Sequence, residues 1–397
     1  MKILFYCSKF PPLAGGAGID AFQLGKDLSV RNYQVFVVCE GIKGLPKHEQ
    51  MNENFHIYRE RAPFFRKNGN GFYFLLLCFM IGMKGIRLIL RHKIDLLHIH
   101  DAATGIAGLI THFITKIPTV FKFGGSMTYE YMCNAAGNKW NPVVGENWVW
   151  QNVHGFAKLV FAIEKMFYYE FDCIYPIAKY LSNMLQEHLH INGSKVTIIH
   201  NGVDTHVIKK EKYINIKEKL NIHKLIFTGV RFIRCKGVDV LINACLPILN
   251  KYDAHLVISG SGPAEKGLKK LAQENPRILF TGNLSWNENL NYVRSADVFV
   301  LPSFVDKTPS CLMEALALEV PCIASDIAGI KELITPGGGF LVPPNNPSAI
   351  RDKIKWILNH PDESRNMGIN GRSFMKQNFE WEKTRDQIES LYYNLKI

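Results

Sequence analysis

Short apolar runs alternate with amphipathic segments along most of the chain, and this pattern predicts strands that are followed by helices. Residues 3–7 and 34–39 are apolar runs of strand length, and residues 19–30 between them have apolar positions at helical spacing. A further strand is expected at residues 195–199. The same succession returns in the second half, with strands expected at residues 225–228, 255–259, 277–281 and 298–301. This repeated β-α-β order indicates an α/β protein with parallel sheets.

The length of 397 residues exceeds what one ordinary hydrophobic core organises, so two domains are expected. Asn201-Gly202-Val203-Asp204 is a strong turn signal, and a lysine-rich run at residues 209–219 follows it. We therefore expect a first domain at residues 1–205, a second domain at residues 206–377 and a final helical segment at residues 378–397.

The stretch at residues 297–324 combines features of a phosphate-binding and sugar-binding unit. Its strand is followed by a polar loop and by Thr308 and Pro309, an N-cap residue and a proline at the first helical position. The helix after them is almost wholly apolar, so Glu314 within it needs a partner or ligand hydroxyls. The start of this helix offers backbone N–H groups to a phosphate, and Asp306 lies in the preceding loop. The alternative is that Asp306 is a solvated loop residue and Glu314 a satisfied core carboxylate.

The order acid, seven residues, acid, from Asp306 to Glu314 and then Ala315 and residues 320–325, resembles a known signature. It is similar to retaining glycosyltransferases of the GT-B fold, and most similar to family four of the glycosyltransferase classification. The resemblance implies two Rossmann-like α/β domains that face a central cleft, with the acceptor on the first, the nucleotide sugar on the second, and a last helix that crosses back. It also implies that Asp306, where the family usually has Glu, contacts the donor sugar and that Glu314 binds the ribose.

The resemblance extends to the loops of the second domain. Arg231 and Lys236 have the family's spacing for two cations that bind the donor diphosphate, although such a pair can also be simply solvated. Gly260 belongs to a tight phosphate-side loop, and residues 282–284 form the turn that holds the nucleobase in the family. The predicted donor-binding residues are Gly15, Gly16, Arg231, Lys236, Gly260, Gly282, Asn283, Leu284, Asp306, Thr308, Pro309, Ser310, Cys311, Leu312 and Glu314.

A dinucleotide fold is the rival interpretation of the first domain. Residues 16–21 satisfy the pattern G-x-G-x-x-A, and Glu40 ends the second strand. The pattern disfavours NAD(P), because a loop with two prolines separates the first glycine from its strand. In the resembling family, the Gly15-Gly16 pair lets the backbone approach the donor phosphate or the acceptor.

The acceptor side is less defined. His98 and His100 alternate with apolar residues, so they share one face near the end of a strand, either as structural residues or as part of the active-site lining. A metal site is not expected, since no further ligands lie nearby. Gly124 stands where many relatives have a histidine, which leaves the catalytic residue of this side open between His100 and Glu130. The acceptor-side candidates are Lys122, Gly124, Gly125 and Glu130.

Composition and charge restrict the partners. The chain is 47% hydrophobic and 21% charged, and its nine cysteines show no CxxC pair, which favours a globular protein of the reducing cytoplasm. We expect no signal peptide, and the apolar segment 72–83 is too short to span a bilayer. Residues 59–93 carry eight Lys or Arg residues and one acid, and the net charge is +12. This segment is either a buried helix with a basic rim or a peripheral contact to an anionic membrane, on its inner face; nucleic acid is disfavoured.

Together these features predict a glycosyltransferase. The expected reaction moves a sugar from a UDP- or GDP-linked donor to a glycan or lipid-linked acceptor, with retention, in the synthesis of a surface polysaccharide such as lipopolysaccharide. The expected catalytic residues are Asp306, Arg231, Lys236 and His100, with no metal and no cofactor apart from the nucleotide sugar. Two alternatives remain: an epimerase or phosphorylase on the same fold, and a non-catalytic binding subunit, which Gly124 makes plausible.

Overall fold

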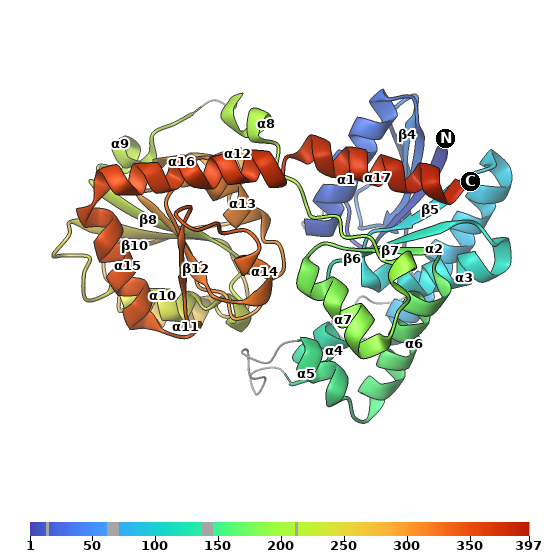
Figure 1. The fold of residues 1–397 in the computed structure, drawn as a ribbon, viewed down its shortest axis with the longest axis horizontal. Coiled ribbons are helices and arrows are strands. Elements are labelled where there is room, and N and C mark those ends of the chain that lie inside the picture. The colour runs from blue at the N-terminus through green and yellow to red at the C-terminus, as the bar shows by residue number, and fades with distance from the viewer. Residues whose placement is uncertain (13–15, 62–70, 137–145, 211–212, 397) are drawn as a thin grey trace. The chain divides into compact units, whose positions relative to one another are not determined.

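The computed structural model describes residues 1–12, 16–61, 71–136, 146–210 and 213–396 (Figure 1). These residues form two compact units, each with its own largely parallel sheet, as the strand and helix pattern predicted. The first unit contains the described residues up to His200 and those from Arg385 onward, and the second contains Asn201–Thr384. The chain enters the second unit at Asn201, whereas the first domain was expected to extend to residue 205.

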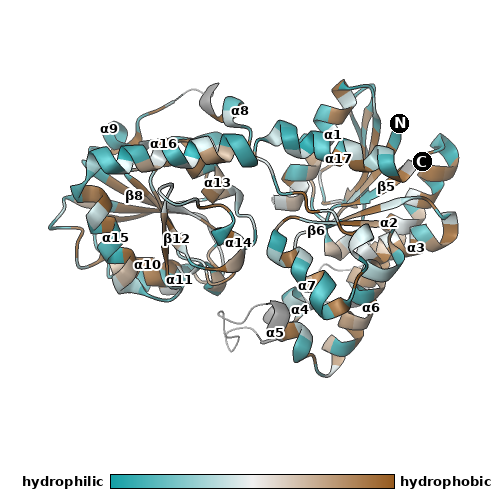
Figure 2. Cartoon of the chain, in the orientation of Figure 1, coloured by the Kyte–Doolittle hydropathy of each residue, from teal (hydrophilic) through white to brown (hydrophobic). Residues whose placement is uncertain are grey.

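The first unit is built on a seven-stranded sheet with the order β3-β4-β2-β1-β5-β6-β7. Neighbouring strands are parallel, except that β3 and β4 form an antiparallel pair at one edge. The central strands are buried along nearly their whole length, as expected for a sheet covered on both faces, and Figure 2 shows them as hydrophobic. The strands are Lys2–Cys7 (β1), Gln34–Glu40 (β2), His48–Asn52 (β3), Phe55–Glu60 (β4), Leu96–Ile99 (β5), Thr119–Phe123 (β6) and Cys173–Pro176 (β7).

Helices cover both faces of this sheet. Helix α1 packs on β1, β2 and β4, where Gly25 lies against the ring of Phe55. Helices α2 and α3 lie side by side on the other face, where Gly85 of α2 lies against the Tyr6 hydroxyl. The helices are Gly16–Val30 (α1), Gly71–His92 (α2), Gly105–Thr115 (α3), Met127–Ala136 (α4), Glu146–Gln151 (α5), Phe156–Glu170 (α6) and Lys179–Leu189 (α7).

Helix α2 is longer than the apolar segment expected at residues 72–83. Its stretch Tyr73–His92 has a mean hydropathy of 1.9 and is long and apolar enough to cross a membrane, so the expectation of too short a segment was wrong. The helix continues because apolar positions recur among its basic residues. About half of this stretch, 44%, is buried, since α2 connects β4 to β5 and packs on the sheet. Its burial therefore identifies α2 as a crossover helix of the first unit.

A buried carboxylate fixes the start of α4. Glu164 of α6 is fully buried and accepts hydrogen bonds from the backbone N–H groups of Met127 and Thr128, both at 2.9 Å. The hydroxyl groups of Ser126 and Tyr168 donate to the same carboxylate at 2.9 and 2.6 Å. Burial raises the pKa of Glu164, and these donors oppose that shift. The network holds α4, and with it Glu130, in a fixed direction.

The second unit is built on a six-stranded parallel sheet with the order β10-β9-β8-β11-β12-β13. The strands expected from the sequence are all present in this unit. The strands are Lys224–Gly229 (β8), Ala254–Ser259 (β9), Ile278–Gly282 (β10), Val298–Leu301 (β11), Cys322–Ser325 (β12) and Phe340–Val342 (β13). The helices are Thr205–Lys210 (α8), Ile216–Leu220 (α9), Val238–Cys245 (α10), Glu265–Leu271 (α11), Trp286–Ser295 (α12), Ser310–Ala317 (α13), Ala328–Lys331 (α14), Pro347–Asn359 (α15) and Pro361–Asn378 (α16).

The last helix, α17 (Trp381–Lys396), returns the chain to the first unit at Arg385. Tyr392 is fully buried, and its hydroxyl lies 2.5 Å from His98 Nδ1 in β5. The hydroxyl groups of Tyr33 and Tyr393 are 2.8 Å apart, and Arg31 forms ion pairs with Asp386 and Glu389 of the same helix. The core of the first unit therefore includes side chains from both ends of the described chain.

The strand expected at residues 195–199 is absent from the described structure. Gly193–Lys195 is a short 3₁₀ helix, and Val196 makes only an isolated bridge to Ile174. Thr197 and Ile199 each donate one backbone hydrogen bond to β7, at 3.0 and 3.1 Å. The segment lies along the edge of the sheet without becoming a regular strand.

Candidate active site

Two loops of the second unit meet because a glycine permits it. Gly237 has a φ of +62°, and a Cβ atom at this position would lie 2.1 Å from the carbonyl oxygen of Pro302. The loop after β8 therefore approaches the loop after β11 closely, and the Phe304 N–H donates to the Cys235 carbonyl at 2.8 Å. The ends of two neighbouring parallel strands thus supply one site.

This approach brings Lys236 against Asp306. The ammonium nitrogen lies 2.6 Å from Oδ2 of Asp306, and the two side chains are 16% and 13% exposed. Burial alone would lower the pKa of Lys236, but the charge and hydrogen bond of Asp306 outweigh it and raise that pKa. The site therefore contains a permanent cation whose partner carboxylate can turn to hydroxyl groups when an anion replaces it.

Helix α13 begins beside this ion pair. Its N-cap is Pro309, and no side chain caps it, so the prediction of Thr308 as N-cap was one residue too early. Thr308 instead accepts a hydrogen bond from Asn201 Nδ2 at 3.0 Å. The N–H of Leu312 donates to the Pro309 carbonyl at 3.1 Å, so it is already satisfied. The backbone N–H groups of Ser310 and Cys311, in the first turn, have no acceptor within the helix.

Glu314 has a protein partner, as its setting in an apolar helix required. Trp286 of α12 donates its indole N–H to Oε1 of Glu314 at 2.8 Å. Burial raises the pKa of Glu314 to about 7, against the opposing effect of this hydrogen bond. The second carboxylate oxygen of Glu314 is therefore available to hydroxyl groups of a ligand, and the charge of this carboxylate changes near neutral pH.

The glycine-rich turns of the sheet pack against the same loops. Gly260 has a φ of +135°, and a Cβ atom there would lie 1.9 Å from the Val230 carbonyl oxygen. Its N–H donates to the Gly282 carbonyl at 2.9 Å, and Gly282 itself has a φ of +71°. Asn283 is exposed and Leu284 is partly exposed. The loops after β8, β9 and β10 are therefore joined at one edge of the sheet.

Arg231 is exposed at the end of β8. Its backbone carbonyl accepts a hydrogen bond from the Ile233 N–H at 2.9 Å, which folds the loop back toward Lys236. No ion pair of its guanidinium is found within the described part of the chain. The structure thus places both predicted cations on one loop, but only Lys236 contacts Asp306.

In the first unit, the two histidines share a face as expected, and their rings stack at 3.8 Å. His98 is a structural residue, because its ring nitrogens contact the hydroxyl groups of Tyr392 and Tyr175. His100 is 2% exposed, and neither ring nitrogen has a hydrogen-bond partner among the described residues. Burial, followed by the proximity of His98 and Lys122, lowers the pKa of His100 well below its usual range. His100 is therefore neutral at physiological pH.

Of the other acceptor-side candidates, Lys122 lies near enough to His100 to affect its pKa. Lys122 of β6 is buried and pairs with Asp20 of α1 at 2.8 Å. Gly124 and Gly125 follow this strand and are partly exposed, whereas Glu130 is exposed on α4. The remaining predictions concern Gly16, which begins α1, and Gly15, which lies outside the described residues.

Three contributors to this candidate site were not identified from the sequence. Trp286 and Asn201 hold Glu314 and Thr308, but each partner is distant in sequence. Gly329 is the second residue of α14, and a Cβ atom there would lie 2.1 Å from the Lys307 carbonyl oxygen. A glycine soon after a strand was the only available signal for this contact. The described residues contain no group of three or more His, Cys, Asp or Glu side chains that could hold a metal ion.

Known protein families match most of the residues of both units. Residues 14–207 match the family described as Glycosyltransferase Family 4, and residues 209–374 match Glycosyl transferases group 1. The chain is 24% identical over 392 residues to the N-acetyl-alpha-D-glucosaminyl L-malate synthase of Bacillus anthracis, covering 97% of this chain and 95% of that protein. Sucrose-phosphate synthase from Thermosynechococcus elongatus shares the fold, with a TM-score of 0.82 at 20% identity, over 100% and 99% of the two chains.

Other relatives match over shorter lengths. An uncharacterized glycosyltransferase of Methanocaldococcus jannaschii is 29% identical over 227 residues, which cover 56% of this chain and 60% of that relative. The capsular polysaccharide biosynthesis glycosyltransferase CapM of Staphylococcus aureus is 25% identical over 257 residues, or 61% and 67% of the two chains.

Both units contain largely parallel sheets, and the second presents cations, carboxylates and a helix start at its strand ends. Together with the family matches, these features define a nucleotide-sugar-dependent glycosyltransferase of the GT-B class. The chain belongs to the group 1 glycosyltransferases, family 4.

Proposed function

We propose that this glycosyltransferase transfers a sugar from a UDP- or GDP-linked donor to a hydroxyl group of a glycan or lipid-linked acceptor, with retention of configuration. The observation that carries the proposal is the 2.6 Å contact of Lys236 with Asp306 at the start of α13. A cation, a carboxylate and a helix N-terminus meet there, which suits a diphosphate attached to a polyol. The relative named for capsular polysaccharide biosynthesis supports surface polysaccharide synthesis as the setting.

In the proposed reaction, the bond between the anomeric carbon and the β-phosphate oxygen breaks, and the oxygen keeps the electron pair. The charge that develops on the phosphates is stabilised by Lys236, by Arg231 and by the N–H groups at the start of α13. Asp306 orients the sugar, and Glu314 fixes the ribose. The acceptor oxygen bonds to the anomeric carbon and releases its proton to the departing phosphate.

The decisive experiment is thermal stabilisation of the protein by UDP, GDP, CDP, ADP and NAD, compared with the Lys236→Ala variant. A ligand at a hundred times its dissociation constant adds about 2.7 kcal/mol to the free energy of unfolding. We expect a shift with one nucleoside diphosphate that is lost in Lys236→Ala. A shift with NAD alone would contradict the proposal.

The products separate transfer from the related reactions of the fold. Incubation with the stabilising donor and an acceptor alcohol should yield a glycoside whose anomeric configuration, measured by NMR coupling constants, equals that of the donor. A 2-epimerised sugar nucleotide would instead identify an epimerase, and phosphate-dependent release of sugar phosphate would identify a phosphorylase. Binding without turnover would identify a non-catalytic subunit.

We also propose that the enzyme docks on the cytoplasmic face of an anionic membrane through α2. Leu75, Phe79 and Leu90 are 52%, 51% and 73% exposed on this helix, and Arg91 and Lys93 are exposed at its C-terminal end. Apolar side chains with adjacent cations match the boundary between lipid chains and acidic headgroups.

Vesicle flotation tests this docking. The protein should float with phosphatidylglycerol-containing vesicles at low salt, and Phe79→Ser should reduce the bound fraction several-fold. Ile369→Ser is the matched control, because Ile369 is 48% exposed on α16 of the second unit. No flotation of the unmodified protein at low salt would exclude the membrane as a partner.

A further inference from the structure

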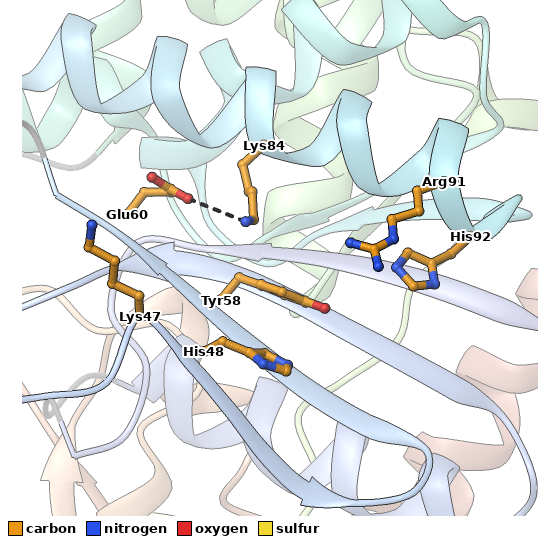
Figure 3. Close-up of a pocket in the computed structure, with 7 residues that line it drawn as sticks. All are labelled: Lys47, His48, Tyr58, Glu60, Lys84, Arg91 and His92. Atoms are coloured by element: carbon orange, nitrogen blue, oxygen red, sulfur yellow. Dashed lines mark ion pairs between the residues drawn. The ribbon is translucent and has the colours of Figure 1, made fainter.

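The first unit has a pocket of about 500 Å³ that is separate from the residues of the donor site (Figure 3). It lies between the C-terminal half of α2 and the strands β3 and β4 at one side of the sheet, as the origin of its lining residues shows. Three of the seven lining side chains are Lys or Arg and one is Glu, so the lining carries a net charge of +2 with neutral histidines. The lining residues are Lys47, His48, Tyr58, Glu60, Lys84, Arg91 and His92.

The walls of this basic pocket are held in place by ring contacts. His48 and Tyr58 are directly opposite each other in the β3–β4 register, and their rings stack at 4.5 Å with an interplanar angle of 16°. The Lys84 ammonium lies over the Tyr58 ring, 4.7 Å from its centroid. The His92 ring packs against Phe36 of β2 at 4.8 Å. These contacts hold the two histidines, Tyr58 and Lys84 in place before a ligand binds.

The cations of the basic pocket are incompletely neutralised. The Lys84 ammonium is 3.9 Å from Glu60 Oε1, a loose ion pair between partly exposed side chains. Within the described ranges of the chain, the side chains of Lys47 and Arg91 form no ion pair. Figure 3 shows Lys47 and Arg91 at opposite ends of the pocket, with the Tyr58 hydroxyl directed toward Arg91. An anion in the pocket would be attracted by positive charge from more than one side.

The environment of His92 reports the same excess of positive charge. Burial lowers the pKa of His92, and the charges of Arg91, Lys2 and His56 lower it further. A bound anion would oppose the three charge effects, so the pKa of His92 should rise when the pocket is filled.

We propose that the basic pocket binds a phosphate group. The planar guanidinium of Arg91 suits two phosphate oxygens, while Lys84 and Lys47 supply compact charges and Tyr58 a hydroxyl donor. The phosphate belongs either to an anionic lipid headgroup or to a soluble phosphate compound. The neighbouring Leu90, 73% exposed on α2, is placed to contact the apolar part of a lipid.

The test follows the imidazole signal of His92 by NMR in the full-length protein with ¹³C-labelled histidine. Inorganic phosphate, dihexanoyl-phosphatidylglycerol below its micellar concentration, and dihexanoyl-phosphatidylcholine are titrated in turn. We expect a saturable shift of His92 with at least one of the first two probes. A shift with inorganic phosphate identifies a soluble phosphate as a ligand, and a shift with phosphatidylglycerol alone identifies a lipid headgroup.

Two arginine variants on one helix make the test specific. Arg91→Gln should weaken the affinity at least tenfold, because Arg91 lines the pocket. Arg87→Gln removes the same charge one turn earlier, from an exposed residue that does not line it, and should change the affinity less than twofold. Equal losses in both variants would reveal general charge attraction and overturn the proposal. A His92 signal that responds to neither phosphate nor phosphatidylglycerol would also overturn the proposal.

Discussion

At Lys236 the ammonium group already contacts a carboxylate, so a donor diphosphate must compete with Asp306 for it. We expect Lys236→Ala, and likewise Arg231→Ala, to lower turnover at least about a hundredfold, the scale of losing one donor to a developing oxyanion. Lys355→Ala is the control, since its amino group only pairs with Asp352 on the surface of α15. Steady-state kinetics would check this, and normal turnover in Lys236→Ala would disprove the assigned role.

Glu314 predicts a pH dependence. Its pKa is raised to about 7, so the group is largely neutral at pH 6 and largely ionised at pH 8. Because ribose hydroxyl groups donate to an ionised carboxylate, donor affinity should increase over this interval. Calorimetric titration with the nucleoside diphosphate at each pH should show the increase in the native enzyme and a flat profile in Glu314→Gln. Without a ligand, the effect on folding stability has the opposite sign. The pKa of Glu314 is higher in the folded protein than the usual value of 4.5, so the free energy of unfolding decreases as the pH rises from about 4.5 to about 7.

At the residue scale, the sequence was sufficient where chemistry and spacing coincide. Glu314 was identified because a carboxylate within an apolar helix requires a partner, whereas Asp306 and Lys236 were assigned from the spacing that they share with the resembling family. Trp286 could not be identified, because an exposed indole gives no indication of which distant carboxylate it contacts. The ion pair between Lys236 and Asp306 depends on a loop approach across 70 residues.

At the scale of elements, Gly237 is the residue on which the meeting of two loops depends. Gly237→Ala should lower the stability of the second unit by about 2 kcal/mol or more, because of its positive φ and the contact with Pro302. Gly267→Ala is the matched control in α11, where a Cβ atom meets nothing within 4 Å and should stabilise the helix by up to about 1 kcal/mol. Chemical denaturation of both variants would measure the difference. Equal stabilities would show that the loops do not depend on this close approach.

The elements that the sequence predicted best are buried strands, because apolar runs of strand length that are bounded by turn signals are typical of a sheet covered on both faces. The pair formed by the edge strand β3 and its neighbour β4 was missed. His48–Asn52 (β3) is polar and mostly exposed and derives its structure from pairing with β4. Residues 195–199 were assigned as a strand on apolar content alone. Their single row of contacts to β7 shows why local composition cannot distinguish a strand from a chain that follows a sheet edge.

At the scale of the whole molecule, the first unit depends on a helix encoded at the other end of the chain. Tyr392→Ala should destabilise this unit by about 3–5 kcal/mol, since it empties a fully buried site next to His98. Tyr393→Ala, at a residue 55% exposed, should cost much less. Hydrogen exchange of the backbone in β1 and β5 would locate the loss, and unchanged protection in Tyr392→Ala would show that α17 is dispensable.

The docking of Tyr392 also has a consequence for biosynthesis. A ribosome that has completed His200 must translate about 190 further residues before the tyrosine that fills the first core exists. At about 5–20 residues per second this takes about 10–40 s, during which the first unit lacks the side chain that fills its core. Until then, part of the apolar interior of the first unit is uncovered. We therefore expect this unit to bind a chaperone during synthesis.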